Sequence, residues 1–174
     1  MSELRTNRII PRDGLTSGTG IAGGIIQIKQ TIKKDQFTTA STVSSGGYVD
    51  LTGLSVAITP TRSDSKVLIK AVIYNSNANA VNFFRVLRGS TFIEQPSGTS
   101  SSGANYNAHA FAYYNADNWQ DSTVIEILDE PATTSETTYK IQMAVTSNIG
   151  TINKFYNTSN YYGISTITAM EVSG

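Results

Sequence analysis

Cysteine is absent from the 174 residues of this chain, and histidine and tryptophan occur once each, as His109 and Trp119. Without cysteine the chain has no disulfide and no thiol chemistry. A zinc site draws on several histidine or cysteine ligands, so one histidine argues against zinc. We therefore expect no metal and no other cofactor.

Charged side chains are also scarce. They make up 15% of the residues, with 13 basic against 13 acidic. Binding to nucleic acid needs a basic excess, so we expect no nucleic-acid partner. A surface this poor in charge must be covered by Ser, Thr, Asn and Gln, or be partly hidden in an assembly.

Long apolar runs are missing as well. No stretch approaches the roughly 18 apolar residues of a membrane helix, and the N-terminus lacks the apolar core of a signal peptide. We expect no membrane insertion. If the protein leaves a cell, we expect it to do so as part of a particle.

The sequence has no window with the i, i+3, i+4 apolar spacing of a long helix, and instead shows short alternating stretches from Ile25 to the end. About eight to ten strands separated by Ser, Gly and Asn-rich turns are typical of a sandwich or jelly roll. The predicted fold class is all-β: an antiparallel jelly-roll sandwich over residues 25–174, preceded by an extended N-terminal arm over residues 1–24.

Residues 48–74 are the clearest part of this pattern. Val49 and Leu51 share one face of a strand, and the apolar set resumes one register later, after Gly53, at Leu54. An alternation that slips at a glycine predicts a β-bulge that keeps both halves on the same core. Pro60 lacks a backbone donor and ends the strand.

The next strand, residues 66–74, is apolar on both faces and therefore needs cover on both. One cover is the core, and the other is interpreted as a partner subunit. A row of alanines between residues 107 and 114 allows another surface to approach, either a neighbouring subunit or the opposite sheet. The predicted seam of a homotrimer consists of Leu68, Val72, Tyr74, Ala108, Ala110 and Ala112.

Three phrases also resemble a known group of proteins: VDLTGLSVAITP at 49–60, KVLI at 66–69 and LRGS at 87–90. They resemble small virion proteins of tailed phages, especially marine ones. The resemblance covers most of the chain from Gly24 onward. It implies a short N-terminal docking peptide and a jelly-roll head similar to C1q or tumour necrosis factor domains, which are usually trimeric.

The first 24 residues differ from the rest, because arginines bracket apolar side chains and four glycines follow between residues 18 and 24. Guanidinium groups pair with carboxylates at interfaces, and β-branched residues before Pro11 favour an extended form that lies in a groove or adds to a sheet edge. Packing of the arm on its own trimer is the alternative. The predicted docking residues are Leu4, Arg5, Arg8, Ile9, Ile10 and Arg12.

Aromatic residues gather around two polar loops between residues 105 and 121. Aromatic side chains with Asn and Asp on loops are common in sugar and protein recognition. The alternative is that they pack under those loops or across a trimer seam. The candidate contacts for a host glycan or receptor are Tyr106, Tyr113, Tyr114 and Trp119.

Three motifs for chemistry are weak. Residues 18–23 match GxGxxG, but coil precedes them and a strand follows, whereas the nucleotide fingerprint opens a helix. His109 lies mid-strand without a nucleophile motif nearby, so we interpret it as structural. Residues 117–121 offer oxygens to Ca²⁺ but do not form an EF-hand loop. We therefore expect no catalytic residue and no enzyme.

The sequence thus predicts a structural protein of a phage virion, a short tail fibre or a capsid decoration. Its arm would bind other virion proteins, and its trimeric head would face outward, where host adhesion is a further possibility. The alternative function is a carbohydrate- or receptor-binding module without a main scaffolding role. An enzyme such as a glycan hydrolase would need paired carboxylates in a recognisable context.

Overall fold

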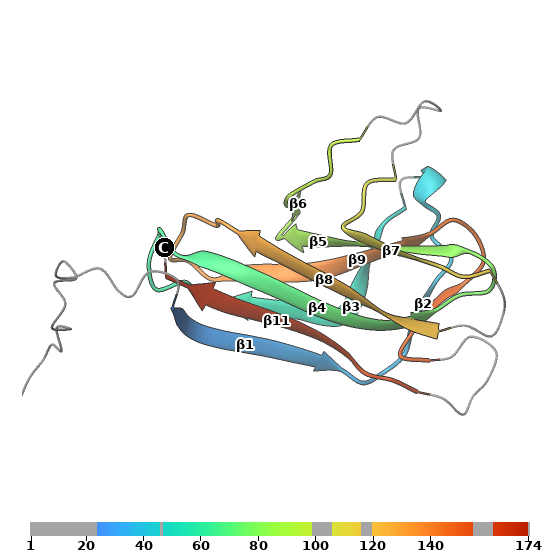
Figure 1. Cartoon of the computed structure of the whole chain (residues 1–174), viewed down its shortest axis with the longest axis horizontal. Coiled ribbons are helices and arrows are strands. Elements are labelled where there is room, and N and C mark those ends of the chain that lie inside the picture. The colour runs from blue at the N-terminus through green and yellow to red at the C-terminus, as the bar shows by residue number, and fades with distance from the viewer. Residues whose placement is uncertain (1–23, 46, 99–105, 116–119, 155–161, 174) are drawn as a thin grey trace, which may run out of the picture.

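The computed structural model describes residues 24–45, 47–98, 106–115, 120–154 and 162–173, and these residues form β-strands joined by turns (Figure 1). Among them no helix has the length and hydropathy to cross a membrane. The elements in chain order are β1 (Ile25–Lys33), β2 (Phe37–Thr39), the 3-10 turn η1 (Val43–Ser45), β3 (Val49–Ile58), β4 (Lys66–Ser76), β5 (Val81–Arg88), β6 (Thr91–Phe92), β7 (Ala110–Tyr113), β8 (Gln120–Asp129), β9 (Thr137–Val145), β10 (Gly150–Ile152) and β11 (Ser165–Val172).

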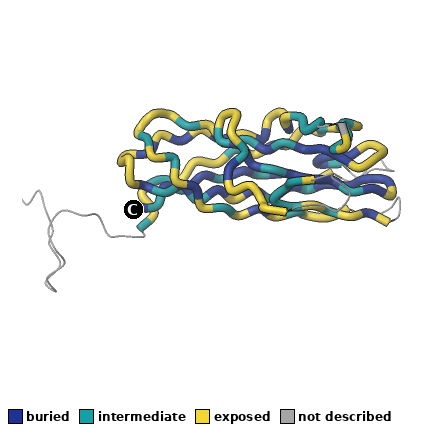
Figure 2. The backbone as a smooth tube through the Cα atoms, turned by 90° about the horizontal axis from the view of Figure 1, so that it is seen from above, coloured by how far each residue is buried: buried dark blue, intermediate teal, exposed yellow. Residues whose placement is uncertain are grey.

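The strands form two antiparallel sheets, which we call sheet A and sheet B. In sheet A, β4 pairs with β8 along one edge and with β11 and then β10 along the other, while β1 and β2 extend the sheet beyond β11 and β10. In sheet B, β9 lies between β3 and β5, and both β6 and β7 pair with the far edge of β5. The two sheets pack face to face, which Figure 2 shows from above.

The order of the long strands is that of a jelly roll. The eight longest strands can be numbered one to eight in chain order: β1, β3, β4, β5, β7, β8, β9 and β11. In this numbering the spatial order is one, eight, three, six in sheet A and two, seven, four, five in sheet B. The chain therefore crosses between the sheets repeatedly, as in a double Greek key. This confirms the predicted all-β sandwich.

Strand β3 contains the predicted bulge. Gly53 has a φ of 84°, in the left-handed region, and the register with β9 shifts between Asp50 and Ser55. Leu51 and Leu54 are buried on either side of the bulge. Because glycine tolerates this backbone conformation, the strand can bend and still keep its apolar side chains on one core.

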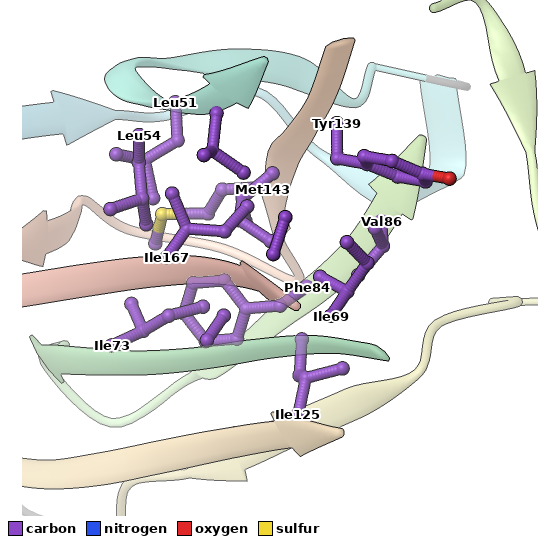
Figure 3. Close-up of a cluster of buried hydrophobic side chains, with 14 of the residues drawn as sticks. Leu51, Leu54, Ile69, Ile73, Phe84, Val86, Ile125, Tyr139, Met143 and Ile167 are labelled. Atoms are coloured by element: carbon purple, nitrogen blue, oxygen red, sulfur yellow. The ribbon is translucent and has the colours of Figure 1, made fainter. Parts of the chain in front are cut away.

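The core lies between the sheets (Figure 3). Sheet A contributes one face of β4, whose residues Val67, Ile69, Ala71 and Ile73 are fully buried, as the alternation predicted. Each large aliphatic or aromatic side chain buried in this way stabilises the fold by about 1.5–3 kcal/mol. The side chains that meet them from sheet B include Leu54, Val56, Phe84, Val86, Ile141 and Met143.

Two polar contacts tie the ends of the strands together. Asp129 at the end of β8 is buried and receives hydrogen bonds from Arg88 of β5 at 2.7 and 2.9 Å and from the Tyr139 hydroxyl of β9 at 2.7 Å. Glu171 of β11 is also buried and accepts hydrogen bonds from Gln27 of β1 at 2.6 Å and from the connection after β3. Burial opposes the charge of Glu171, but these donors outweigh it and lower its pKa.

Candidate functional site

The outer face of sheet A carries two rows of apolar side chains. In the first row, the backbone register places Ile28 beside Met170, Met170 beside Leu68 and Leu68 beside Leu128. The second row lies four residues further along β4 and contains Ile32, Val72 and Val124, with the polar Thr166 between Ile32 and Val72. Between them lies a polar row that includes Lys70 and Glu126, whose charged atoms are 3.5 Å apart.

These rows are open to solvent within the described part of the chain. The exposed fraction is 57% for Ile28, 53% for Val124 and 46% for Leu128. Contiguous apolar surface on a soluble protein marks a contact with another molecule more often than isolated apolar residues do. The sequence predicted Leu68 and Val72 on such a face, but it did not indicate that β1 and β8 extend the face on both sides.

Tyr74, the third predicted seam residue on β4, continues this face beyond Val72. Its ring lies against Gly163, where a Cβ atom would collide with the ring. Burial of the ring raises the pKa of the phenol. The segment before β11 therefore covers part of Tyr74, and Tyr74 offers less surface to a partner than an open strand residue would.

The three alanines of the predicted seam do not share a face with Leu68 and Val72, so this part of the prediction is corrected. Ala110 and Ala112 lie on β7 of sheet B, and Ala108 precedes that strand. Ala110 packs against the core of the sandwich. Ala110 thus faces the opposite sheet, which was the alternative interpretation, and Ala112 shares its side of β7 by strand alternation, while Phe111 and Tyr113 point outward.

Those outward side chains form an exposed aromatic group on sheet B. Phe111 and Tyr113 of β7 are 68% and 66% exposed, and Tyr106 is 44% exposed. Phe83 of β5 contacts two of these rings, with its ring centroid 5.8 Å from that of Tyr106 and 6.2 Å from that of Phe111. Tyr106 and Tyr113 are therefore accessible, as a contact residue must be.

Tyr114, another predicted contact residue, is corrected to a core position. It is 2% exposed, and its hydroxyl donates to the carbonyl oxygen of Asn75 at 2.9 Å and to the Asn75 side chain at 2.7 Å. Burial raises the pKa of this phenol well above its ordinary value. The strand alternation that exposes Tyr113 turns Tyr114 inward. Trp119, the fourth candidate, lies outside the described residues.

A polar group beside these aromatic rings has no signature in the sequence. The guanidinium carbon of Arg85 on β5 lies 4.0 Å from the ring centroid of Tyr48 and 5.3 Å from that of Phe92. Its Nε donates to Gln142 at 2.8 Å, and Gln142 donates in turn to Asp50 at 2.6 Å. Arg85, Gln142 and Asp50 meet only because β5 pairs with β9 and β9 pairs with β3, so no local pattern could have indicated them.

His109 has a structural position beside β5. Its Nδ1 accepts a hydrogen bond from the Val86 amide at 2.9 Å, and its Nε2 donates to the Ile93 carbonyl at 2.8 Å. The imidazole thus bridges the gap between β6 and β7, which pair with successive parts of β5. Burial lowers the pKa of His109, against weaker opposing effects that include the Glu94 charge.

Protonation of His109 is therefore expected to destabilise the fold, because imidazolium cannot accept the Val86 N–H. With a folded pKa below the ordinary 6.5, the stabilisation is complete above about pH 6.5 and is lost as the pH falls through the folded pKa. A glutamine at position 109 would keep a hydrogen-bond acceptor and a donor, but it does not titrate. Urea unfolding at about pH 7.5 and pH 5 should show that the free energy of unfolding falls more for the wild type than for His109→Gln as the pH is lowered. Equal losses would contradict this role.

The remaining predicted residues lie outside the described part of the chain. These are the docking residues of the arm, the glycine motif at 18–23 and most of the loop at 117–121. Among the described residues, no three His, Asp or Glu side chains gather in a group that suits a metal ion.

Comparisons with known proteins find no matching family and no matching curated protein. Similar solved structures include three of infectious bursal disease virus: the VP2 subviral particle at 11% identity and a TM-score of 0.39, the Gx strain at 13% and 0.39, and derived T=1 particles at 13% and 0.37. Each covers 95% of this chain, whereas this chain spans only about two fifths of theirs. At these values the likeness does not show which family the chain belongs to.

Proposed function

We propose that this chain is a structural protein of a tailed-phage virion, either a short tail fibre or a capsid decoration. Its β-sandwich head associates as a homotrimer through the outer face of sheet A, and residues 1–24 anchor it to another virion protein. The phage assignment rests on the resemblance at residues 49–60, 66–69 and 87–90.

The observation that carries the assembly part of this proposal is the open apolar face of sheet A. Ile28, Leu128 and Val124 remain about half exposed in one chain. Burial of apolar surface drives association, at about 25 cal/mol for each Å² removed from water. The charges on this face are already paired as Lys70 with Glu126, so a second copy can cover the rows without leaving these two charges unpaired.

The anchoring part rests on how the described head begins. Gly24 accepts a hydrogen bond from the Ser173 amide at 2.9 Å, so the chain enters and leaves the sandwich at one end. The preceding residues carry Arg5, Arg8 and Arg12 beside apolar side chains. Such a segment suits docking in a groove of another protein, because arginine pairs with carboxylates while the aliphatic residues fill adjacent pockets.

Deletion of residues 2–14 is expected to leave a folded head that no longer enters particles. The deletion removes the predicted docking residues and leaves both sheets intact. Particles assembled with the full or the deleted chain can be purified and tested by immunoblot, with circular dichroism as the control for folding. Normal incorporation of the deleted chain would exclude the arm as the anchor.

Adhesion to a host surface is a second candidate function, favoured by the exposed aromatic group of Tyr106, Phe111 and Tyr113 on sheet B. This group lies on the sheet opposite the proposed trimer face. A virion protein can therefore carry both functions, since assembly and recognition use different surfaces of the sandwich.

A further inference from the structure

The outer surface of sheet B combines exposed rings with a guanidinium group that has no carboxylate partner. Phe83 and Arg85 are two residues apart on β5 and so project to the same face, about 7 Å apart along the strand. Phe83 pairs across the sheet with Phe111, and Tyr106 packs on the Phe83 ring. The rings and the cation therefore form one surface, which we call the aromatic face.

Arg85 is held in place but not neutralised. Tyr48 and Phe92 lie against its guanidinium, and Gln142 fixes its Nε. Among the described residues, no ion pair involves Arg85. A guanidinium packed on aromatic rings keeps its terminal N–H groups aligned for a bidentate contact with an anion.

The carboxylate of Asp50, which acts electrostatically on Arg85, is already engaged by other donors. Asp50 accepts hydrogen bonds from Lys140 at 2.7 Å and from Gln142 at 2.6 Å. Lys140 and Asp50 balance each other, so these two side chains together with Arg85 carry one net positive charge. Tyr48 does not supply an anion at neutral pH, because burial raises the pKa of its phenol to about 12.

Exposed aromatic rings beside planar hydrogen-bonding groups suit the flat apolar faces and the hydroxyl groups of sugars. Tyr106 and Phe111 both contact the ring of Phe83, at centroid distances of 5.8 and 6.2 Å. Tyr113 follows Phe111 by two residues and continues the surface by about 7 Å. The surface is therefore longer than one sugar ring, and its charge complements an acidic ligand.

We infer that the aromatic face binds an acidic oligosaccharide, whose sugar rings stack on Tyr106, Phe111 and Tyr113 while a carboxylate or sulfate group pairs with Arg85. This deepens the adhesion candidate and rests on it. It also names a ligand class and a residue, Arg85, that the sequence did not indicate.

The test measures binding to the purified full-length chain by isothermal titration calorimetry. The probes are hexamers of galacturonate, of mannuronate and of a sulfated galactan, with neutral maltohexaose as the matched uncharged chain. We expect at least one acidic hexamer to bind about tenfold more tightly than maltohexaose, because a charge-assisted hydrogen bond strengthens the contact. Added salt should weaken that binding.

Three variants locate the site. Phe111→Ala and Tyr113→Ala remove exposed rings, and each should weaken binding several-fold, as loss of an aromatic contact does. Arg85→Gln should remove the preference for the acidic hexamer. Tyr162→Ala is the control, since Tyr162 is 58% exposed and belongs to the segment before β11. It should bind as the wild type does.

Several results would overturn the inference: no binding of any acidic hexamer at millimolar concentration, equal binding of maltohexaose, or unchanged affinity in the three variants. Loss of the oligomer in Phe111→Ala or Tyr113→Ala would show that the face contacts a second copy instead. Because binding is measured on the purified chain and anchoring is measured in particles, the inference and the proposed virion role can fail independently.

Discussion

Replacing Val124 and Leu128 with lysine is expected to give a folded monomer, because both residues lie on the face through which we propose that the head forms a trimer. Both residues are about half exposed on β8, so the single chain tolerates the change. Glu126, which pairs with Lys70, lies between them on the same face and supplies a negative charge near both lysines. In an assembly, however, the two ammonium groups would have to leave water, which costs several kcal/mol for each ion.

Light scattering coupled to size-exclusion chromatography measures this directly, at the same protein concentration for each form. The matched control places two lysines on the outer face of sheet B, as Ser55→Lys with Ala57→Lys, at exposed positions of β3. The control should keep the mass of three chains. A trimer that survives the Val124 and Leu128 changes would exclude the outer face of sheet A, and a monomeric wild type at micromolar concentration would exclude the trimer.

Replacing Asp129 with alanine is expected to destabilise the head by about 3 kcal/mol, as for a buried ion pair that loses one partner. The carboxylate of Asp129 accepts from Arg88 of β5 and from the Tyr139 hydroxyl of β9, and it belongs to β8 of the other sheet. Its loss leaves the Tyr139 hydroxyl without its carboxylate partner in the core. It also removes an ion pair that joins the two sheets.

Urea unfolding followed by circular dichroism gives this free energy of unfolding. Asp64→Ala is the control, because the Arg62–Asp64 pair is similar in length, at 2.7 Å, but exposed on both sides. An exposed pair contributes little, so the control should unfold almost as the wild type does. If the free energy of unfolding fell by the same small amount in both variants, the contact of Asp129 between the sheets would not stabilise the fold as expected.

The local features of the fold followed from the sequence because they depend on neighbours along the chain. Alternation with period two separated the buried Ile69 from the outer Leu68. Gly53 indicated the bulge, because the alternation shifts by one residue at this glycine, whose backbone lies in the left-handed region. Each of these outcomes needs only the order of a few adjacent residues.

The composition of the surfaces did not follow from the sequence. Alternation shows which side chains of one strand share a face, but it does not show which sheet the strand joins or what lies opposite. The alanines of β7 were therefore assigned to the same seam as Leu68, although β7 belongs to the other sheet and Ala110 packs on the core. Tyr114 was assigned to the surface for the same reason, and it lies in the core beside Asn75.

The sequence by itself determined the class of fold, the strand pattern and the outward position of Leu68 and Val72, because these depend on local periodicity. Only the tertiary structure decided that β1, β11, β4 and β8 join their apolar residues into one face. It likewise placed Arg85 beside rings from distant parts of the chain. The physical reason is that strand pairing joins residues more than a hundred positions apart, such as Ile28 and Met170, and no local preference encodes such a pair.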